Sequence, residues 1–380
     1  MSDTSGVVRI AKHFETWTDP RVKRTLLHGL MDIVIIAICG TIAGCDSWED
    51  LPKYGAAKLD WLRQFLRLEN GIPSADTFAR VFPQRNADEF LKCFSSWTAA
   101  LRRQVDGEIV ALDGQTLRGS GDDARGPLHL VRAFATENRL VLGQEACAEK
   151  SNEITAIPKL LKLIEISGAI VTIDARGCQT EIAQAILDRE ADYVLHVKDN
   201  QPKLHAAVQE ELGAALKDAL EGNAPAFREQ ATHDTAHGRC EERTYYSLPV
   251  PKRSPVFRRW PGVRSLGMVV RVRTINGRES REISDDISSL RVGVKRFAKA
   301  VRSHWGIENH LHWMLDVNFG QDASRIRKAG GPHLASLLRQ LALTLLQRDQ
   351  TQRGSLRGKR KIAGWDNQAL EAILAHSQVI

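Results

Sequence analysis

The sequence predicts a mixed α/β fold, a sheet with helices on its faces, preceded by a small all-α domain. Three observations support this prediction. Apolar residues recur at helical spacing from about residue 13 to residue 105. Three short β-rich runs follow, and helical and strand patterns then alternate up to about residue 222. A further group of strand patterns occupies residues 223–290 before helices resume.

The first hundred residues read as several helices whose breaks are marked by Pro20, by residues 70–74 (NGIPS) and by Pro83. The most apolar run, residues 31–45, contains Asp32 and is shorter than the roughly 20 residues that span a bilayer. It is therefore expected to be a helix buried in the core. No apolar leader opens the chain, so a secreted protein is not expected.

The middle of the chain has a specific order of elements. Strands are predicted at 108–114, 128–137 and 139–149, followed by a helix at 155–166 and a buried strand at 169–175. A helix at 180–190, a buried strand at 192–198 and a helix from 201 complete the series. Three antiparallel strands followed by alternating helix and strand suit the mixed sheet of ribonuclease H-like folds.

Five segments follow from these patterns. We expect a helical domain at 1–105 and the first part of an α/β domain at 106–222. Residues 223–292 form a β-rich insertion or extra strands that cover the sheet. Residues 293–350 return to helices, and 351–380 form a basic C-terminal tail with five cationic side chains, Arg353, Arg357, Lys359, Arg360 and Lys361.

Composition restricts the class of protein. A formal charge of +7 is a mild indication of a polyanionic partner, because Lys and Arg displace counterions from phosphates. The six cysteines are scattered singly with no C-x-x-C pair, which argues against a disulfide framework and against a cysteine-rich zinc site. A reducing cytoplasm fits this usage.

Two aspartates stand at the ends of predicted strands. Asp113 closes EIVALDG and Asp174 closes AIVTIDA, and ligands of α/β proteins bind at such strand ends. One aspartate after a strand is more often a turn or capping residue, but two in matching positions favour a site. Carboxylates brought together repel unless a cation lies between them, and oxygen ligands suit Mg²⁺ or Mn²⁺.

A third acidic ligand is expected from the helix RSHWGIENHLHWMLDV, residues 302–317. Glu308 is the natural candidate, with His304 and His312 four residues to either side as supporting or DNA-contacting groups. A zinc site made of His304, Glu308 and His312 is the alternative, although the chain has no H-E-x-x-H pair. Trp305 and Trp313 are expected to be packing residues, and Trp305 could instead stack on a displaced base.

With these residues identified, the chain resembles bacterial insertion-sequence transposases of the DDE type, in particular the H-repeat-associated group linked to Rhs elements. The resemblance extends from about residue 13 to residue 348. It is carried by SWEDL (47–51), NGIPSADTFARV (70–81), ALDGQTLRGS (111–120), EKSNEITAIP (149–158), TIDARGCQ (172–179), YVLHVKDNQ (193–201), HGRCEER (237–243) and HWGIENHLHWMLDV (304–317).

The resemblance implies that residues 1–105 are the family's associated helical domain, which could bind DNA ends. It also implies a ribonuclease H-like catalytic domain interrupted by the β-rich insertion, with Asp113, Asp174 and Glu308 as catalytic residues and metal ligands. It implies Mg²⁺, for which Mn²⁺ can substitute, and no organic cofactor. The partners implied are double-stranded DNA, at the element's own ends and at the target, and a homodimer or larger assembly on paired ends, with no membrane. The candidates for phosphate contacts are Arg118, Lys150, Lys198, Arg239 and Arg243, and those for supporting roles are Asn200, Gln201, His304, Asn309 and His312.

The chain also departs from the family pattern. Gln321 replaces an acidic residue, and Asp285 and Asp286 stand where relatives tend to have aromatic residues. Two rival functions therefore remain beside transposition. One is a DNA-binding remnant or regulator that no longer cuts, against which the three intact acidic residues count. The other is a metal-dependent nuclease of the same fold that does not join strands.

Overall fold

The computed structural model describes residues 6–17, 19, 21, 26–83, 87–103, 105–122, 125–147, 153–236, 239–251 and 253–375. Its centre is one nine-stranded mixed sheet in the order β3-β2-β1-β4-β5-β9-β8-β7-β6. The strands are β1 (Ile109–Thr116), β2 (His129–Ala135), β3 (Leu140–Cys147), β4 (Ile170–Ile173), β5 (Asp192–Val197), β6 (Arg228–Ala236), β7 (Arg239–Pro249), β8 (Ser265–Ile275) and β9 (Arg278–Ser288).

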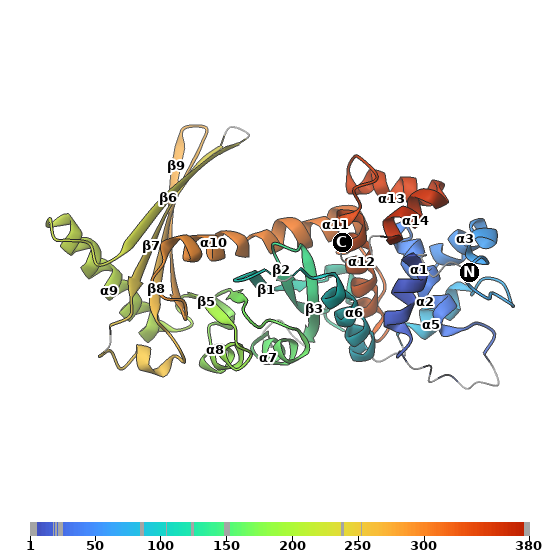
Figure 1. The fold of residues 1–380 in the computed structure, drawn as a ribbon, viewed down its shortest axis with the longest axis horizontal. Coiled ribbons are helices and arrows are strands. Elements are labelled where there is room, and N and C mark those ends of the chain that lie inside the picture. Colours follow the sequence, from blue (N-terminus) through green and yellow to red (C-terminus); the bar gives the residue numbers. More distant parts are fainter. Residues whose placement is uncertain are drawn as a thin grey trace.

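Helices surround this sheet and form a separate body at one end of it (Figure 1). The helices before the sheet are α1 (Gly6–Phe14), α2 (Leu30–Ile42), α3 (Asp50–Ala57), α4 (Leu59–Leu62), α5 (Ala75–Val81) and α6 (Ala87–Leu101). Those within and after it are α7 (Glu153–Leu163), α8 (Thr180–Leu187), α9 (Pro202–Leu220), α10 (Val294–His304), α11 (Trp313–Phe319), α12 (Gly331–Arg348), α13 (Leu356–Trp365) and α14 (Asn367–Ala375).

The predicted order of strands is confirmed. β1, β2 and β3 pair in antiparallel fashion, and β1, β4 and β5 pair in parallel. The residues of β4 and the first half of β1 are all buried, because helices cover both faces of parallel strands. In the register of the parallel pair, Leu112 lies opposite Ile173, so Asp113 and Asp174 each follow the last paired residue on adjacent strands.

The strands of residues 223–290 extend the sheet at its edge and do not cover it. β9 pairs with β5, and β8, β7 and β6 follow as an antiparallel meander of strands 9 to 11 residues long. Their outer halves project beyond the body of the protein (Figure 1). The inner halves of β8 and β9 stay buried, and residues from the middle of both strands form one wall of the cavity described below.

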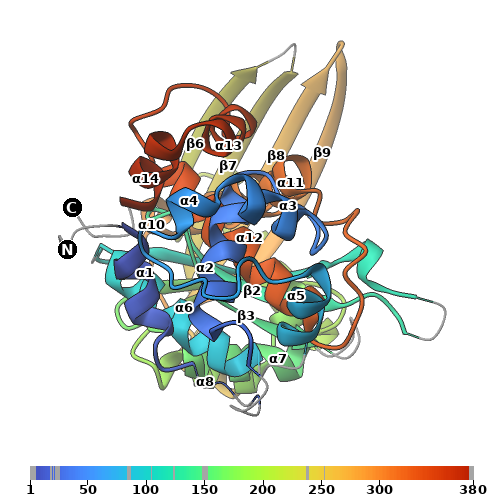
Figure 2. The same cartoon turned by 90° about the vertical axis from the view of Figure 1, so that its right-hand side faces the viewer.

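The helical body unites the two ends of the chain, as Figure 2 shows along the long axis. α2 is the expected core helix, with ten successive buried residues from Ile33 to Ile42, and α12 packs against it. Within the described residues, no helix is long and apolar enough to cross a membrane. All six cysteines are free, which agrees with the absence of a predicted disulfide framework.

The expected basic tail is folded as α13 and α14 and packs on this helical body. Two of its cationic side chains are buried. Lys359 pairs with Asp349 at 3.1 Å, and Arg360 pairs with Asp46 at 2.8 Å while its guanidinium carbon lies 4.2 Å from the centre of the Phe319 ring. The segment therefore belongs to the folded body, and its other three cationic side chains are exposed.

The helix expected at residues 302–317 is not regular. α10 ends at His304, a π-helical turn spans Glu308–His312, and α11 begins at Trp313. Together, α10, the π-helical turn and α11 cross over the sheet from the β6–β9 extension to the helical body (Figure 1). The expectation that Trp305 and Trp313 are packing residues is wrong, since they are 48% and 56% exposed.

Candidate active site

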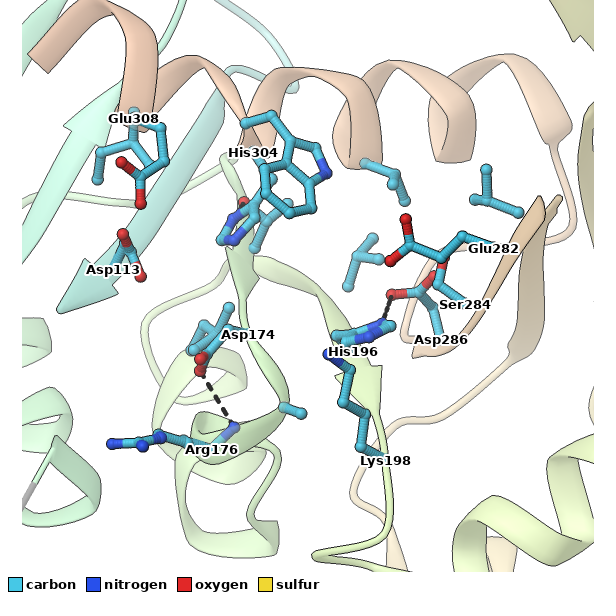
Figure 3. Close-up of a pocket in the computed structure, with 18 of the residues that line it drawn as sticks. Asp113, Asp174, Arg176, His196, Lys198, Glu282, Ser284, Asp286, His304 and Glu308 are labelled. Carbon is cyan, nitrogen blue, oxygen red and sulfur yellow. Dashed lines mark hydrogen bonds and ion pairs between the residues drawn. The ribbon is translucent and has the colours of Figure 1, made fainter. Parts of the chain in front are cut away.

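Asp113 and Asp174 line one cavity together with Glu308. Asp174 follows the end of β4 as expected, but Asp113 does not end its strand, because β1 continues to Thr116 in the antiparallel pairing with β2. The cavity has a volume of about 400 Å³ and is bounded by β4, β5, the middle of β8 and β9, and the end of α10. The carboxylates of Asp113 and Glu308 face each other, and Asp174 projects into the same space from the neighbouring strand (Figure 3). Three acidic residues that are distant in sequence therefore line one cavity, although Asp174 is not among the residues whose ligand atoms lie within 4.8 Å of one another.

Asp174 also caps the short turn that follows it. Its Oδ1 accepts hydrogen bonds from the backbone N–H groups of Arg176, at 3.1 Å, and Gly177, at 3.4 Å. Two polar side chains hold the same turn from the β5–α9 loop. Asn200 donates to the carbonyl of Ala175 at 2.7 Å, and Gln201 donates to the carbonyl of Cys178 at 3.0 Å. Both residues, expected to support the site, thus position the loop behind Asp174.

The carboxyl groups of Asp113 and Glu308 influence each other strongly. Burial, and then the charges of Glu308 and Asp174, raise the pKa of Asp113 to about 7. The neighbouring His312 imidazole holds the pKa of Glu308 below its ordinary value. The two carboxylates therefore repel each other in the absence of a cation, and this excess of negative charge is what a divalent ion would relieve. Carboxylate ligands of this kind fit Mg²⁺ or Mn²⁺.

His312 lies closest to this pair. Its Nδ1 is 3.4 Å from Oδ2 of Asp113 and 3.6 Å from Oε2 of Glu308, and the residue is 3% exposed. Among the described residues, Asp113, Glu308 and His312 form the one group of His, Cys, Asp or Glu side chains that could hold a metal ion, with ligand atoms within 4.8 Å of one another.

The zinc site proposed as an alternative is not formed, because His304 points elsewhere. Its Nδ1 lies 2.9 Å from Oγ1 of Thr172 on β4. It lines the cavity but is absent from the group around His312. The π-helical turn contributes to this separation, since it breaks the regular spacing on which the prediction relied. Asn309 is exposed and its amide lies 3.5 Å from the carbonyl of Trp305.

A buried polar network beneath the site was missed in the sequence. Arg132 on β2 lies opposite Asp113 in the antiparallel backbone register of β1 and β2, and its side chain is fully buried. Its guanidinium donates to Ser336 at 3.1 Å and to Gln115, whose amide donates to Asp316 on α11 at 3.1 Å. The network ties β1 and β2 to α11 and α12. Its signal in the sequence was an arginine within the apolar run LHLVRAFA.

A second buried polar group, at the start of α7, was also not recognised in the sequence. Glu153 is buried and accepts a hydrogen bond from His129 at 2.6 Å, and Arg176 lies 3.7 Å from the same carboxylate oxygen. The other ring nitrogen of His129 is 2.8 Å from Oγ1 of Thr116. The motif EKSNEITAIP contains Glu153, but spacing alone does not reveal that its partner lies on β2.

The predicted phosphate contacts are scattered. The Arg118 side chain is 84% exposed and lies 3.4 Å from Asp322, and Lys198 is exposed at the cavity. Arg239 is partly exposed and pairs with the buried Glu241. Arg243 is only 5% exposed and pairs with Glu241 and Asp234 at 2.6 Å, so the expectation that it contacts phosphate is not supported. Lys150 lies outside the described residues.

The three departures from the family pattern are integrated into the fold. Gln321 is buried and donates to Gln115 at 3.1 Å, which places it in the network of Arg132. Asp286 lies 3.5 Å from His196, and Asp285 lies 3.2 Å from His205. None of them displaces Asp113, Asp174 or Glu308 from the cavity.

Comparisons with known proteins find relatives along nearly the whole chain. Residues 105–345 match the family described as Transposase DDE domain, and residues 11–98 match the family described as DDE_Tnp_1-associated. The chain is 39% identical over 363 residues to "Putative transposase YncI" of Escherichia coli O157:H7, which covers 94% of this chain and 92% of that protein. It is 37% identical over 376 residues to "H repeat-associated putative transposase YhhI" of Escherichia coli strain K12, covering 97% and 98%. A stretch of 76 residues is 40% identical to "Inactive transposase YbfQ" of the same strain.

Proposed function

The chain belongs to the DDE transposase family, and on this premise we propose that it cleaves DNA at the ends of its own insertion element and joins those ends to target DNA. The observation that supports this most strongly is the convergence of Asp113, Asp174 and Glu308 on one cavity from the adjacent strands β1 and β4 and from the π-helical turn. We further propose that the central sheet is the ribonuclease H-like core of the family, with β6–β9 as its insertion.

We propose Asp113, Asp174 and Glu308 as the ligands of Mg²⁺, or of Mn²⁺ in its place. When bound, such ions supply positive charge beside the phosphate and stabilise the attacking and leaving oxygens. The residues of the chain position the reaction. The backbone turn held by Asn200 and Gln201 fixes Asp174, and the network of Arg132 fixes the helix that bears Glu308 against the sheet.

The proposed reaction has two displacements at phosphorus. In the first, water attacks the phosphodiester at the element's end, the bond from phosphorus to the 3′ oxygen breaks, and a 3′-hydroxyl is released. In the second, that hydroxyl attacks a target phosphodiester, forms a new ester bond and displaces the target's own 3′ oxygen. Neither step requires a covalent intermediate with the protein.

Duplex DNA is the proposed partner, and several exposed cations lie where it could approach. Lys198 stands at the cavity itself, and Arg118 stands near a second hollow, lined by Glu308, His312 and Asp322, on the other side of Glu308. Phosphate contacts of this kind set the register of the DNA without reading its sequence. We also propose that the protein acts on the DNA of the nucleoid, as a dimer or larger assembly that pairs two element ends.

Two other functions are compatible with the same cavity. A remnant would retain DNA binding without cutting, and one relative of part of the chain is named an inactive transposase. A nuclease would cut without joining. The acidic residues argue against the first, because an unused group of mutually repelling carboxylates destabilises the protein that keeps it.

The test uses purified protein and a supercoiled plasmid that carries the flanking ends of the element, with Mg²⁺ or Mn²⁺ added. The 3′ ends of the products are sequenced for the wild type and for Asp174→Asn. Cuts at the element boundary together with joined products, both lost in the variant, support transposition. Cuts without joined products indicate a nuclease, and tight binding without cuts indicates a remnant.

A further inference from the structure

We propose that His312 is a direct ligand of the catalytic metal through Nδ1, so that one ion is held by an imidazole nitrogen as well as by Asp113 and Glu308. The inference rests on the proposed metal-dependent function and adds a residue to its metal site. Asp174, which lines the cavity but is outside this group of ligand atoms, would then complete the site or serve a second ion. The identity of the donor atoms changes which metals the protein prefers.

The first support is distance. Two atoms that bind one ion at about 2.1 Å lie about 3.0 Å apart at a right angle and about 3.4 Å apart at the tetrahedral angle. Nδ1 of His312 lies 3.4 Å from Asp113 and 3.6 Å from Glu308. The separations are thus close to those of ligands around a shared ion. They exceed the usual 2.7–3.2 Å of an N–H···O hydrogen bond, so the imidazole is not tightly bonded to either carboxylate.

The second support is the local backbone. Glu308 and His312 are the first and last residues of the π-helical turn, a widened turn that is rare and often found at functional sites. His312 is buried while Glu308 is 55% exposed at its side chain, so the turn presents one ligand from the interior and one from the solvent side. An ion held by both would lie between these two side chains.

Binding also places requirements on the imidazole. The neutral ring is the form that binds metals. Its Nε2 is buried and has no hydrogen-bond partner among the described residues, so it lacks the outer partner that metal-bound imidazoles usually have. Binding through Nδ1 requires that Nε2 carries the proton.

The donor set has a consequence for metal preference. An all-oxygen site suits Mg²⁺, whereas an imidazole ligand shifts preference toward Mn²⁺ and later transition metals. Replacing His312 by Asn keeps a polar group near the position of Nδ1 but offers no imidazole nitrogen. We expect His312→Asn to weaken Mn²⁺ binding by at least the roughly tenfold that loss of an outer partner of a metal ligand costs, and to weaken Mg²⁺ binding less, so that the ratio of the two affinities falls.

The experiment is pulsed electron paramagnetic resonance on the full-length protein with Mn²⁺, which detects a nitrogen nucleus bonded to the ion. The matched control is His304→Asn, because His304 lines the same cavity but bonds to Thr172. Retention of fold in both variants is checked by their thermal transitions. We expect a nitrogen signal in the wild type and in His304→Asn, and none in His312→Asn.

The outcomes separate the two proposals. Bound Mn²⁺ without a nitrogen signal in the wild type overturns the role of His312 and leaves the three carboxylates as the metal site. A nitrogen signal that survives in His312→Asn also overturns the role of His312, because the nitrogen then belongs to another group. Absence of any bound Mn²⁺ at millimolar concentration overturns the proposed metal site, and the ligand role of His312 with it.

Discussion

Replacing Asp113 by Asn should stabilise the metal-free protein at pH 8 while it abolishes cleavage. Burial and the charges of Glu308 and Asp174 raise the pKa of Asp113 from 3.8 to about 7 in the folded protein. Because the folded state holds this proton more tightly than the unfolded state, stability is greatest below about pH 4 and is lost as the pH rises to about 7. The amide of Asn carries no charge, so this loss should be absent in the variant.

The size of this stability loss follows from the interval between the unfolded and folded pKa values of Asp113. At about 1.4 kcal/mol per pH unit, the interval corresponds to a loss of about 4 kcal/mol as an upper bound. Relaxation of the partly exposed Glu308 reduces this, and we expect a gain of about 1–3 kcal/mol in the free energy of unfolding.

The assay is urea denaturation of the wild type and of Asp113→Asn at pH 5 and pH 8 in the presence of EDTA. The exposed Asp60→Asn serves as a charge-matched control that should not change the pH dependence. Added Mn²⁺ should stabilise the wild type at pH 8 and have little effect on Asp113→Asn. An Asp113→Asn variant less stable than the wild type at pH 8 in EDTA would refute the reasoning.

Three further predictions concern the surroundings of the site. Arg132→Met should lower the free energy of unfolding by about 3–5 kcal/mol, measured by denaturation, because it leaves buried partners of the guanidinium unpaired; a neutral result would contradict the network. Trp305→Ala should change stability by less than about 1 kcal/mol but weaken binding of single-stranded DNA by about 1–3 kcal/mol if a base stacks there, and unchanged binding would exclude stacking. Three cations of α13 and of the segment before it are exposed, namely Arg353, Arg357 and Lys361. Neutralising all three should reduce the log–log slope of DNA affinity against salt concentration by about 2–3 without loss of stability. The buried Arg360 is the contrast, since Arg360→Gln should destabilise the protein, and equal stability of both variants would contradict its burial.

The strand order and the meeting of Asp113, Asp174 and Glu308 could be predicted from the sequence. Each aspartate follows a short apolar run, and such runs are recognisable because parallel strands are buried on both faces. The buried helix α2 was predictable for a similar reason, since its apolar run is continuous. The use of the three acidic residues as catalytic ligands remains a proposal.

Features that depend on pairing across the sheet or on side-chain burial could not be predicted. Arg132 lies opposite Asp113 only through the antiparallel register of β1 and β2. Arg243 looks like a phosphate contact in its motif, yet the meander places it beside the buried Glu241. The π-helical turn has no spacing signal, and it separates His304 from His312 although a regular helix would align them.

Glu308→Gln tests the central claim most directly, because it removes one charge from the acidic site at an exposed position. Binding of an element end and cutting of the plasmid are measured on the same preparation, with wild type beside it. We predict that the variant binds DNA with an affinity within a fewfold of the wild type and makes no cuts at any concentration of Mg²⁺ or Mn²⁺. Normal cutting by the variant would contradict the assignment of Glu308, and with it the proposed site.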